Sequence, residues 1–435
     1  MNREAARTPA PGSQTPVFDY FAQVELPTPT LGDDEVQLLF AESFGVEVEL
    51  HALGSQQDQN FRVFERGSAE PLGVLKLSNP VFSEAEIEMQ DAAAAVVSAH
   101  DPALRIPRVV DGAHGPMSTW WESSEGRIHA RVIENISGRT LMGSDYLAPA
   151  VVERMGELSA RVSVALADFT HPASGRVLQW DLRYAARVVD TLLPDEPDAD
   201  VRRVVADAVH DALAALDPVA ADLPLQARHF DITDDNILRP VGGRLPDAVI
   251  DFGDVSRSWR VGEIATTVSS VLHHDGADAL SALPAIRAFC ERRPLDDAEI
   301  TALWPLVVLR GAVLVLSGRA QVRLDEENTY ASVALDREFR VLENAAAQPV
   351  EVMTEIVRAA LGLAPRHEER GWSGAPILDL GAVRVDLDAG TVSPLNDEGA
   401  WLRDDTLDEA AAFALDAGAT AVTLPAWLPV LAGSA

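Results

Sequence analysis

The most constraining feature of the sequence is a polar stretch that lies between two short apolar runs. His229 and Asp231 open the stretch, and Asn236 follows Asp231 by five residues. A second group, Asp251-Phe252-Gly253-Asp254, comes directly after the apolar run 248–250. Asn236 offers an amide oxygen and Asp251 a carboxylate, which are the hard oxygen ligands that Mg²⁺ prefers. The order and the spacing therefore predict a magnesium site next to a loop.

The same stretch indicates phosphoryl transfer, a reaction that asks a protein mainly for positioning and charge stabilisation. Such a reaction needs a group that orients the attacking hydroxyl, and we predict this role for Asp231. His229 is predicted to hold the shape of the loop, and Asn236 and Asp251 are predicted to bind the metal. Each of these residues is ordinary by itself, because Asp and Asn in loops usually serve turns. The hypothesis rests on their joint order.

Lys76 is the only lysine in the sequence. Since every other basic position holds arginine, a lysine that remains suggests a place where a compact ammonium is hard to replace. Lys76 lies at the end of the β-type run 72–77, where a lysine that binds the phosphates of a nucleotide is expected. The alternative is that Lys76 is a solvated surface residue that survived by chance.

A phosphate-binding lysine of this kind needs a carboxylate to hold it, and a helix is predicted to begin at Ser83. Its first turns offer Glu84, Glu86 and Glu88. Ser83 and Glu86 form a capping-box pattern, which would engage Glu86. We therefore favour Glu88, which lies deeper in the helix and shares a face with Glu84. The alternative is that all three are solvated acidic groups that suit the helix dipole.

The turn between the first two predicted strands is a candidate cover for phosphate groups. It contains Ser55, Gln56 and Asp58 after a single glycine, Gly54. The turn matches neither the G-x-G-x-x-G pattern nor the P-loop pattern, but its backbone N–H groups can still cradle phosphates. Position is the only support for this role, because the same residues are typical of an ordinary hairpin.

The order of the predicted elements indicates an α+β fold with two lobes. Residues 1–30 are predicted to form a flexible arm, with one short ordered segment near 17–24. Residues 31–130 are predicted to form a small antiparallel β lobe, and 131–348 a helical lobe that carries the catalytic loop. Residues 349–435 are predicted to contain a linker and a small α/β appendage.

Periodicity and turn signals assign the individual elements. Strands are expected at two or three places within 107–133 and at 46–53, 60–65, 72–77, 377–380, 383–387 and 421–424. Helices are expected at 33–44, 83–97, 147–168, 180–193, 198–216, 263–273, 283–293, 298–321, 332–347, 350–363 and near 407–417.

The composition limits the partners and the location. The 435 residues carry a formal net charge of −33, which argues against nucleic acid or an anionic membrane as partner because both would be repelled. Cys290 is the only cysteine, and the N-terminal residues lack the apolar core of a signal peptide. The most apolar segment, Leu303–Leu316, is interrupted by Arg310 and is too short to span a bilayer. A cytoplasmic location is therefore expected.

Taken together, these motifs resemble the aminoglycoside phosphotransferase-like, or choline-kinase-like, superfamily. His229-x-Asp231-x4-Asn236 and Ile250-Asp251-Phe252-Gly253-Asp254 match its catalytic and metal motifs. More narrowly, the chain is similar to the hydroxylysine-kinase branch, and the resemblance covers about residues 31–347. The branch resemblance rests on the segments Ser55–Phe61, Val74–Pro80, Glu88–Ala92, His171–Ala173 and Trp180–Leu182.

The resemblance implies a bilobal protein-kinase-like fold, ATP or GTP with Mg²⁺, and phosphorylation of a hydroxyl group on a small amine or amino acid. The substrate would be cationic or zwitterionic, such as hydroxylysine, ethanolamine, choline or homoserine. An acidic and aromatic set suits an ammonium group, and Trp180, Asp181 and Asp254 are candidates for these contacts. The alternative is that Trp180 belongs to the core and that Asp181 caps a helix.

The sequence departs from the superfamily within the catalytic loop. Phe230 stands where glycine is usual, and Asp234-Asp235 replaces a middle that more commonly contains His, Pro or Gly. A bulky Phe230 beside Asp231 is expected to narrow the substrate pocket. This departure supports a second hypothesis, a catalytically silent kinase-fold module that binds nucleotide or a partner within a larger assembly. The intact catalytic and metal set favours an active kinase, and the lack of H-R-D and A-P-E segments disfavours a protein kinase.

Bacterial relatives of this branch also occur fused to a class III aminotransferase-like domain. The tail after Val350 is therefore either a small appendage or the start of such a fusion, and a further domain or partner is expected there. The chain itself cannot be the aminotransferase, because that chemistry needs a Schiff-base lysine and Lys76 already lies on the phosphate strand.

Overall fold

The structure is a computed structural model, and it describes residues 17–23, 28–55, 57–143, 145–324, 329–363, 377–380, 383–386 and 391–394. The chain divides into two compact units. The first unit comprises Met1–Ala92, Arg108–Asn135 and Thr170–Leu178, and the second comprises Ala93–Pro107, Ile136–Phe169 and Gln179–Ala435. An antiparallel sheet forms most of the first unit and helices form most of the second, which confirms the predicted α+β class.

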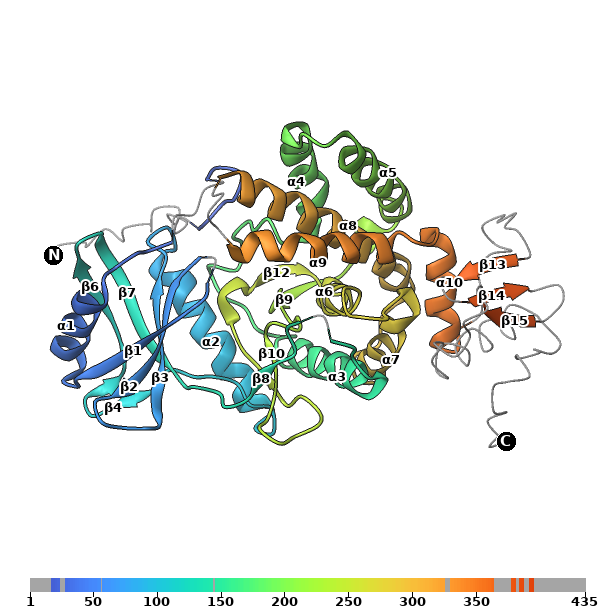
Figure 1. Ribbon diagram of the computed structural model, residues 1–435. Helices are drawn as coiled ribbons and strands as arrows, with labels where there is room; N and C mark the ends of the chain where they lie inside the picture. Colours follow the sequence, from blue (N-terminus) through green and yellow to red (C-terminus); the bar gives the residue numbers. More distant parts are fainter. Residues whose placement is uncertain are drawn as a thin grey trace, which may run out of the picture. The chain divides into compact units, whose positions relative to one another are not determined.

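The first unit contains a five-stranded antiparallel sheet in the order β1-β2-β3-β7-β6 (Figure 1). Its strands are β1 (Val48–Leu53), β2 (Gln59–Glu65), β3 (Pro71–Ser78), β6 (Ser118–Ser123) and β7 (Gly126–Ile133). A short hairpin is formed by β4 (Asp111–Gly112) and β5 (Gly115–Pro116).

One face of this sheet forms the core of the unit. Leu75 and Leu77 of β3 are fully buried on that face, and because side chains alternate along a strand, Lys76 points to the other face. Helix α1 (Asp33–Phe44) covers the core face with Phe40, which is also fully buried. The helix ends at Gly45, whose φ of 70° is the left-handed conformation that closes many helices.

Helix α2 (Glu84–His100) begins directly after Ser83, as predicted. The Glu86 carboxylate accepts hydrogen bonds from the Ser83 backbone N (2.9 Å) and from the Ser83 hydroxyl (2.8 Å). The same carboxylate accepts a hydrogen bond from the backbone N of Phe18 (3.0 Å), and Glu86 is fully buried. The cap therefore also anchors the short ordered N-terminal segment, in which Asp19 pairs with Val177.

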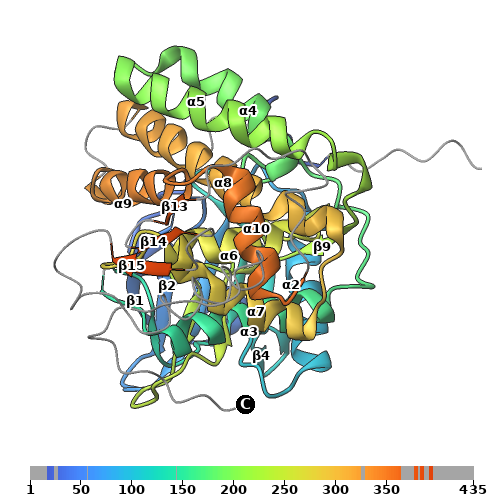
Figure 2. The same cartoon turned by 90° about the vertical axis from the view of Figure 1, so that its right-hand side faces the viewer.

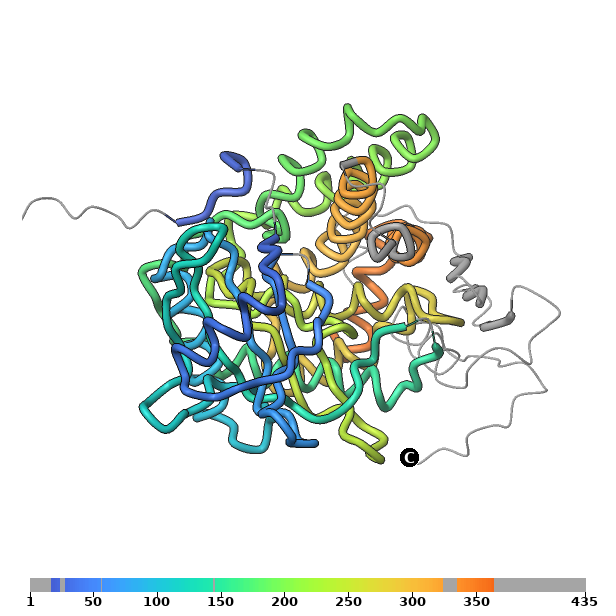
Figure 3. The backbone as a smooth tube through the Cα atoms, turned by 60° about the vertical axis from the view of Figure 1, so that its left-hand side comes forward, coloured from blue at the N-terminus to red at the C-terminus, as the bar shows by residue number. Residues whose placement is uncertain are grey.

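The helices of the second unit are arranged around α8 (Asp297–Leu324). Helix α9 runs beside α8 (Figures 1 and 3), and α4 and α5 lie along another side of it (Figure 2). Helices α6 and α10 also contact α8, while α3 packs against α7. The bounds of these helices are α3 (Pro149–Ala165), α4 (Ala185–Leu192), α5 (Ala199–Leu216), α6 (Gly262–Val271), α7 (Leu283–Arg292), α9 (Thr329–Ala345) and α10 (Val350–Ala360).

Helix α8 is the core helix of this unit. Within the described residues, its segment Asp297–Arg323 is the one helix long and apolar enough to cross a membrane, judged by length and composition alone. Most of that segment is buried inside the protein, with Trp304 and Leu309 completely inaccessible. Burial against other helices explains its apolar character.

Four short strands place the predicted catalytic loop. β9 (Leu225–Arg228) pairs with β12 (Ser256–Trp259), and β10 (Ile237–Arg239) pairs with β11 (Ala248–Val249). On its other side β10 pairs with β8 (Arg139–Thr140). The loop 229–236 thus connects β9 to β10, and the turn 250–255 connects β11 to β12.

Three segments differ from the prediction. The single helix predicted at 180–193 is a succession of the 3₁₀ turn η1 (Leu182–Tyr184), α4 and the 3₁₀ turn η2 (Leu193–Asp195). Helix α10 packs against α5, α7 and α8, so it belongs to the helical unit although the sequence assigned it to the appendage. The tail contains an antiparallel sheet of β13 (Ile377–Leu380), β14 (Val383–Asp386) and an unpredicted β15 (Thr391–Pro394). The helix predicted near 407–417 and the strand predicted at 421–424 lie outside the described residues.

Candidate active site

His229 fixes the shape of the loop 229–236. Its Nε2 lies 3.0 Å from the carbonyl oxygen of Ile250, and its Nδ1 lies 3.2 Å from the backbone N of Asp231. Because a carbonyl only accepts and a backbone N–H only donates, Nε2 carries a proton and Nδ1 accepts one hydrogen bond. The ring is buried and meets the Phe252 ring edge-on, with 4.6 Å between centroids. This is the loop-holding role that was predicted for His229.

Asp231 presents its carboxylate beside an amide and a guanidinium. Nδ2 of Asn236 donates to Oδ2 of Asp231 at 2.6 Å and to its backbone oxygen at 3.0 Å. Nη2 of Arg310 lies 3.6 Å from Oδ1 of Asp231, whose side chain is 33% exposed. A bound molecule can therefore reach a carboxylate that is held in place, which is what orienting a hydroxyl or accepting its proton requires.

The pKa of Asp231 is raised to about 8. Burial is the largest cause, the carboxylates of Asp254, Asp251 and Asp235 add to it, and Arg310 acts in the opposite direction. The exposed part of the side chain is where solvent screens these charges. A divalent cation near these carboxylates would favour the ionised form of Asp231, as Arg310 does.

Asn236 and Asp251 lie close together because β10 pairs with β11. The backbone N of Ile250, the residue before Asp251, donates to the carbonyl oxygen of Asn236 at 2.9 Å. Asn236 directs its Nδ2 to Asp231, so its amide oxygen is the atom left to bind a metal. Asp251 has a φ of 61°, and its Oδ1 accepts a hydrogen bond from the backbone N of Gly253 at 3.1 Å. An amide oxygen and a carboxylate so placed fit a hard cation such as Mg²⁺.

The backbone at Phe230 explains why glycine is usual there. Phe230 has a φ of 75°, which lies in the left-handed region. This conformation costs residues other than glycine about 1–2 kcal/mol. Glu263 offsets this cost, because its buried carboxylate accepts hydrogen bonds from the backbone N of His229 (2.8 Å) and of Phe230 (3.2 Å). The Phe230 ring is fully buried, and the guanidinium of Arg228 lies 4.3 Å from its centroid. The ring therefore lies in the interior, and the expected narrowing of a substrate pocket is wrong.

In the first unit, Lys76 is buried on β3, with 6% of its surface exposed. Its Nζ lies 3.6 Å from Oδ2 of Asp58. Asp58 also accepts a hydrogen bond from the backbone N of Asn79 (3.0 Å), and its own backbone N donates to Oγ of Ser55 (3.2 Å). A carboxylate repels phosphate, so the predicted contact of Asp58 with the nucleotide is disfavoured. The geometry favours a structural role instead, in which Asp58 orients the Lys76 side chain and stabilises the turn. Gln56 lies outside the described residues.

Comparison with known proteins settles the family. Residues 52–295 match the model of the phosphotransferase enzyme family, which is more than half of the chain. The chain belongs to this family. It is accordingly a phosphotransferase with an alcohol group as acceptor. No curated protein matches the sequence.

Solved structures share the fold of this phosphotransferase. A microcompartment-associated aminopropanol kinase is 17% identical, with a TM-score of 0.56 over 78% of this chain and 99% of the other. The amicoumacin kinase hAmiN, in complex with AMP-PNP, Ca²⁺ and Ami, is 17% identical, with a TM-score of 0.54 over 73% and 95%. The spectinomycin phosphotransferase APH(9)-Ia, in complex with ADP and spectinomycin, is 11% identical, with a TM-score of 0.51 over 73% and 99%. These similarities confirm the kinase-like fold, and the hydroxylysine-kinase branch stays a prediction.

On helix α2, the carboxylate whose pKa is affected by the charge of Lys76 is that of Asp91, whereas the sequence favoured Glu88 as the partner of Lys76. Glu88 is exposed on α2. Asp91 lies three residues further along, with its Oδ1 3.2 Å from Nη1 of Arg131. Burial raises the pKa of Asp91, while the charges of Arg131 and Lys76 act to lower it. The packing of α2 turns Asp91 toward the basic groups of the sheet and Glu88 toward solvent, so the predicted Lys76–Glu88 pairing is corrected.

Asp181 is a structural residue in this phosphotransferase. Its carboxylate is fully buried and caps η1 through the backbone N of Arg183 (3.1 Å). It also accepts hydrogen bonds from the Arg183 side chain (2.6 Å) and from the Ser258 hydroxyl (2.5 Å). The prediction that Asp181 contacts the substrate is therefore wrong, and the capping alternative is right. Asp254 is half-buried and contributes to the raised pKa of Asp231, and its predicted contact with the ammonium group of the substrate stays a prediction.

Arg310 is the residue of this site that the sequence analysis did not assign. It comes from the middle of α8, is 5% exposed, and lies 4.8 Å above the Trp180 ring centroid. The predicted aromatic face for an ammonium group is thus taken by a guanidinium of the protein. The signal was present in the sequence, because a single arginine within the apolar run Leu303–Leu316 is costly to bury unless it is paired.

Proposed function

We propose that this phosphotransferase is a magnesium-dependent kinase that transfers the γ-phosphoryl group of ATP or GTP to a hydroxyl of an amino alcohol or hydroxylated amino acid. The carboxylate of Asp231 carries the proposal. It is accessible, it is fixed by Asn236 at 2.6 Å, and it lies beside a pair of oxygen ligands suited to a divalent cation.

Each residue has one task in the proposed reaction. Asp231 orients the acceptor hydroxyl and takes its proton as the oxygen attacks the γ-phosphorus atom, whose bond to the bridging oxygen breaks so that ADP or GDP leaves. Asn236 and Asp251 would hold magnesium, which would neutralise charge on the phosphate oxygens. Lys76 binds nucleotide phosphate through its ammonium group, with Asp58 keeping the side chain in place.

Arg310 favours an acceptor that carries a carboxylate. Its Nε and Nη1 are buried and have no hydrogen-bond partner, although Nη2 lies near Asp231. Each of these unpaired N–H donors can bind a carboxylate oxygen in a charge-assisted hydrogen bond. The surrounding Asp254 and Glu338 give the same neighbourhood an acidic character that suits an ammonium group. A zwitterionic hydroxy amino acid satisfies both.

The test is a panel of acceptors with Mg²⁺ and either ATP or GTP, arranged as pairs that differ only in a carboxylate. Serine is compared with ethanolamine, and threonine with 1-amino-2-propanol; hydroxylysine and homoserine complete the panel. We expect turnover with at least one amino alcohol or amino acid, and a higher kcat/KM for the carboxylate-bearing member of a pair. Turnover of the amines alone would reject the role of Arg310 but keep the kinase.

Asp231→Asn is the matched control for the panel. It keeps the size of the side chain but removes the base, so we expect turnover to fall by about 10²–10⁴-fold. Thermal stabilisation by nucleotide with Mg²⁺ should be retained, because Lys76 and Asp251 are unchanged. If the wild-type chain binds nucleotide but phosphorylates no member of the panel, the silent nucleotide-binding module replaces the kinase.

A further inference from the structure

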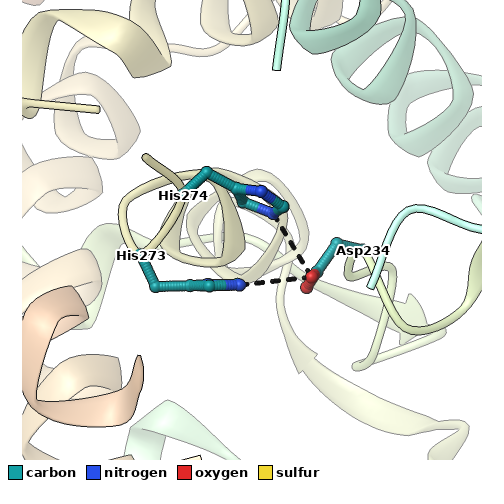
Figure 4. Close-up of side chains that lie close together, drawn as sticks. All are labelled: Asp234, His273 and His274. Carbon is teal, nitrogen blue, oxygen red and sulfur yellow. Dashed lines mark ion pairs between the residues drawn. The ribbon is translucent and has the colours of Figure 1, made fainter. Parts of the chain in front are cut away.

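A second cluster of polar groups lies outside the residues assigned to phosphoryl transfer. It consists of Asp234 from the catalytic loop and of His273 and His274 from the turn after α6 (Figure 4). Nε2 of His273 and Nε2 of His274 each lie 3.3 Å from the same oxygen, Oδ2 of Asp234. All three residues are at most 3% exposed, so the cluster is shielded from solvent.

The hydrogen bonding of His274 leaves its Nε2 without a hydrogen-bond partner. Its Nδ1 lies 2.6 Å from the carbonyl oxygen of Asp145, and since that oxygen only accepts, Nδ1 carries a proton. In the neutral ring, Nε2 is then a lone pair that faces the Asp234 carboxylate. Neither this Nε2 nor Oδ2 of Asp234 has a hydrogen-bond partner. Two buried acceptors that face each other call for a cation, either a proton or a metal ion.

The distances favour a metal ion over a proton. A charge-assisted N–H···O bond is normally about 2.7–2.9 Å long. The edge of a tetrahedron with metal–ligand bonds of about 2.0–2.1 Å is about 3.3–3.4 Å, and both N···O separations in the cluster have this length. The carbonyl oxygen of Gly143 lies 3.1 Å from Nε2 of His273 and accepts a hydrogen bond from it in the metal-free chain, so metal binding by this nitrogen would release its proton.

We propose that Asp234, His273 and His274 bind one divalent transition-metal ion of the zinc class. Imidazole nitrogens suit zinc and its neighbours in the first transition row, whereas Mg²⁺ and Ca²⁺ select oxygen ligands. Two nitrogens and one carboxylate leave a fourth position for the Gly143 carbonyl or a water molecule. This ligand set differs in chemistry from the oxygen pair of Asn236 and Asp251, so the two sites select different metals.

The ion has a structural task in this proposal. Asp234 precedes Asn236 by two residues, and its backbone oxygen accepts a hydrogen bond from the backbone N of Leu141 at 2.9 Å. Through its side chain, a bound ion would fasten the catalytic loop to the end of α6. Asp234, His273 and His274 are therefore positioning residues, and metal binding by them does not depend on which acceptor is phosphorylated.

The experiment measures zinc binding to the full chain without turnover. Protein freed of metal by a chelator is dialysed against Zn²⁺ in the presence of a large excess of Mg²⁺, which occupies oxygen-ligand sites, and bound zinc is determined by elemental analysis. We expect one zinc ion per chain. His273→Ala and Asp234→Asn should each weaken zinc binding by more than about 100-fold, the upper limit for losing an outer-shell partner.

Two control variants isolate the cluster. His210→Ala removes an exposed histidine of α5, and Asp251→Asn removes a ligand of the oxygen pair; both should bind zinc as the wild type does. If a cluster variant does not fold, the visible spectrum of Co²⁺ bound to the wild-type chain distinguishes imidazole ligation from all-oxygen ligation. Zinc binding that is equal in wild type and cluster variants, or no zinc binding by the wild type, overturns the proposal and identifies the cluster as a protonated His–Asp set.

Discussion

Each unit of the molecule contains a buried cation with a carboxylate beside it, and the two cations are chemically different. Lys76 lies on a strand, 3.6 Å from Asp58, and Arg310 lies on a helix, 3.6 Å from Asp231. Lysine is a compact charge on a flexible stem, whereas arginine is a planar group that stacks and binds in a fork. The comparison fits the proposal that Lys76 binds a nucleotide phosphate, and it suggests that Arg310 holds a fixed geometry, since Arg310 stacks on Trp180.

Of the two buried cations, Arg310 should give the larger effect when it is replaced. In Arg310→Met, Asp231 loses the positive charge that offsets the repulsion from the neighbouring carboxylates, and Trp180 loses its stacking partner. We expect kcat to fall about 100-fold, as a misplaced catalytic group does, with nucleotide affinity unchanged. Steady-state kinetics and nucleotide titration check this.

Arg310→Lys sharpens the same test. It keeps the charge but loses the planar stack and the fork, so it should recover only a small part of kcat. Full recovery by Arg310→Lys would mean that Arg310 acts as a point charge only, and the contrast with Lys76 would disappear.

Replacement of Lys76 should have the next largest effect and a different signature. Lys76→Met removes a charged hydrogen-bond donor worth about 1.5–3 kcal/mol, so the Kd for nucleotide should rise about 10–100-fold. Lys76→Arg should restore little affinity, because Lys76 is nearly buried and a planar guanidinium is bulkier than a compact ammonium group. Isothermal titration with ATP and GTP measures both variants, and an unchanged Kd for Lys76→Met would remove Lys76 from the nucleotide site.

The smallest expected effect concerns Glu338, a carboxylate that faces the Arg310 region from α9. Burial raises the pKa of Glu338 to about 7, although Arg337 and Arg310 act against it. Gly318 of α8 leaves room for this carboxylate, because a Cβ there would overlap it. Since the native state holds the proton more tightly than the unfolded chain, Glu338 lowers stability as the pH rises from about 4.5 to about 7.

Glu338→Gln should therefore flatten the pH dependence of stability in this window. Urea unfolding of both proteins at several pH values gives the two slopes, and the variant should lose less stability with rising pH than the wild type. Equal slopes would show that the pKa of Glu338 is not raised. The carboxylates around Arg310 would then be well solvated, and this neighbourhood would lose the buried character that it shares with that of Lys76.

The sequence was sufficient for the groups whose identity alone is unusual. The joint pattern of His229, Asp231 and Asn236 predicted one loop, and the single lysine predicted a strand position, because both signals are local. The α+β order of elements followed from periodicity for the same reason.

The sequence was insufficient where tertiary packing decides. Asp91 and Glu88 lie three residues apart on α2, and only the packing of the helix against the sheet decides that Asp91 pairs with Arg131 while Glu88 is exposed. From the sequence, Asp181 is equally compatible with a helix cap and with a substrate contact. The pairing of β9 and β12 places Ser258 beside Asp181, and this long-range contact identifies its structural role. Arg310 stood out by its apolar surroundings, but its partner Asp231 is 79 residues away in the chain.

The interpretation of Phe230 differs most between the sequence and the structure. Its sequence position suggested an obstacle near the reacting group, and the backbone shows a left-handed residue held by Glu263. A loop carries such a conformation only when its surroundings compensate the strain.

The presence of one lysine in 435 residues also has a practical consequence. Reagents that acylate side-chain amines have a single target in this protein, and that target is nearly buried on β3. The rate of its modification would report how often the strand becomes accessible. Protection by added nucleotide would then turn Lys76 into a built-in chemical reporter of occupancy, with no cysteine or fluorophore to introduce.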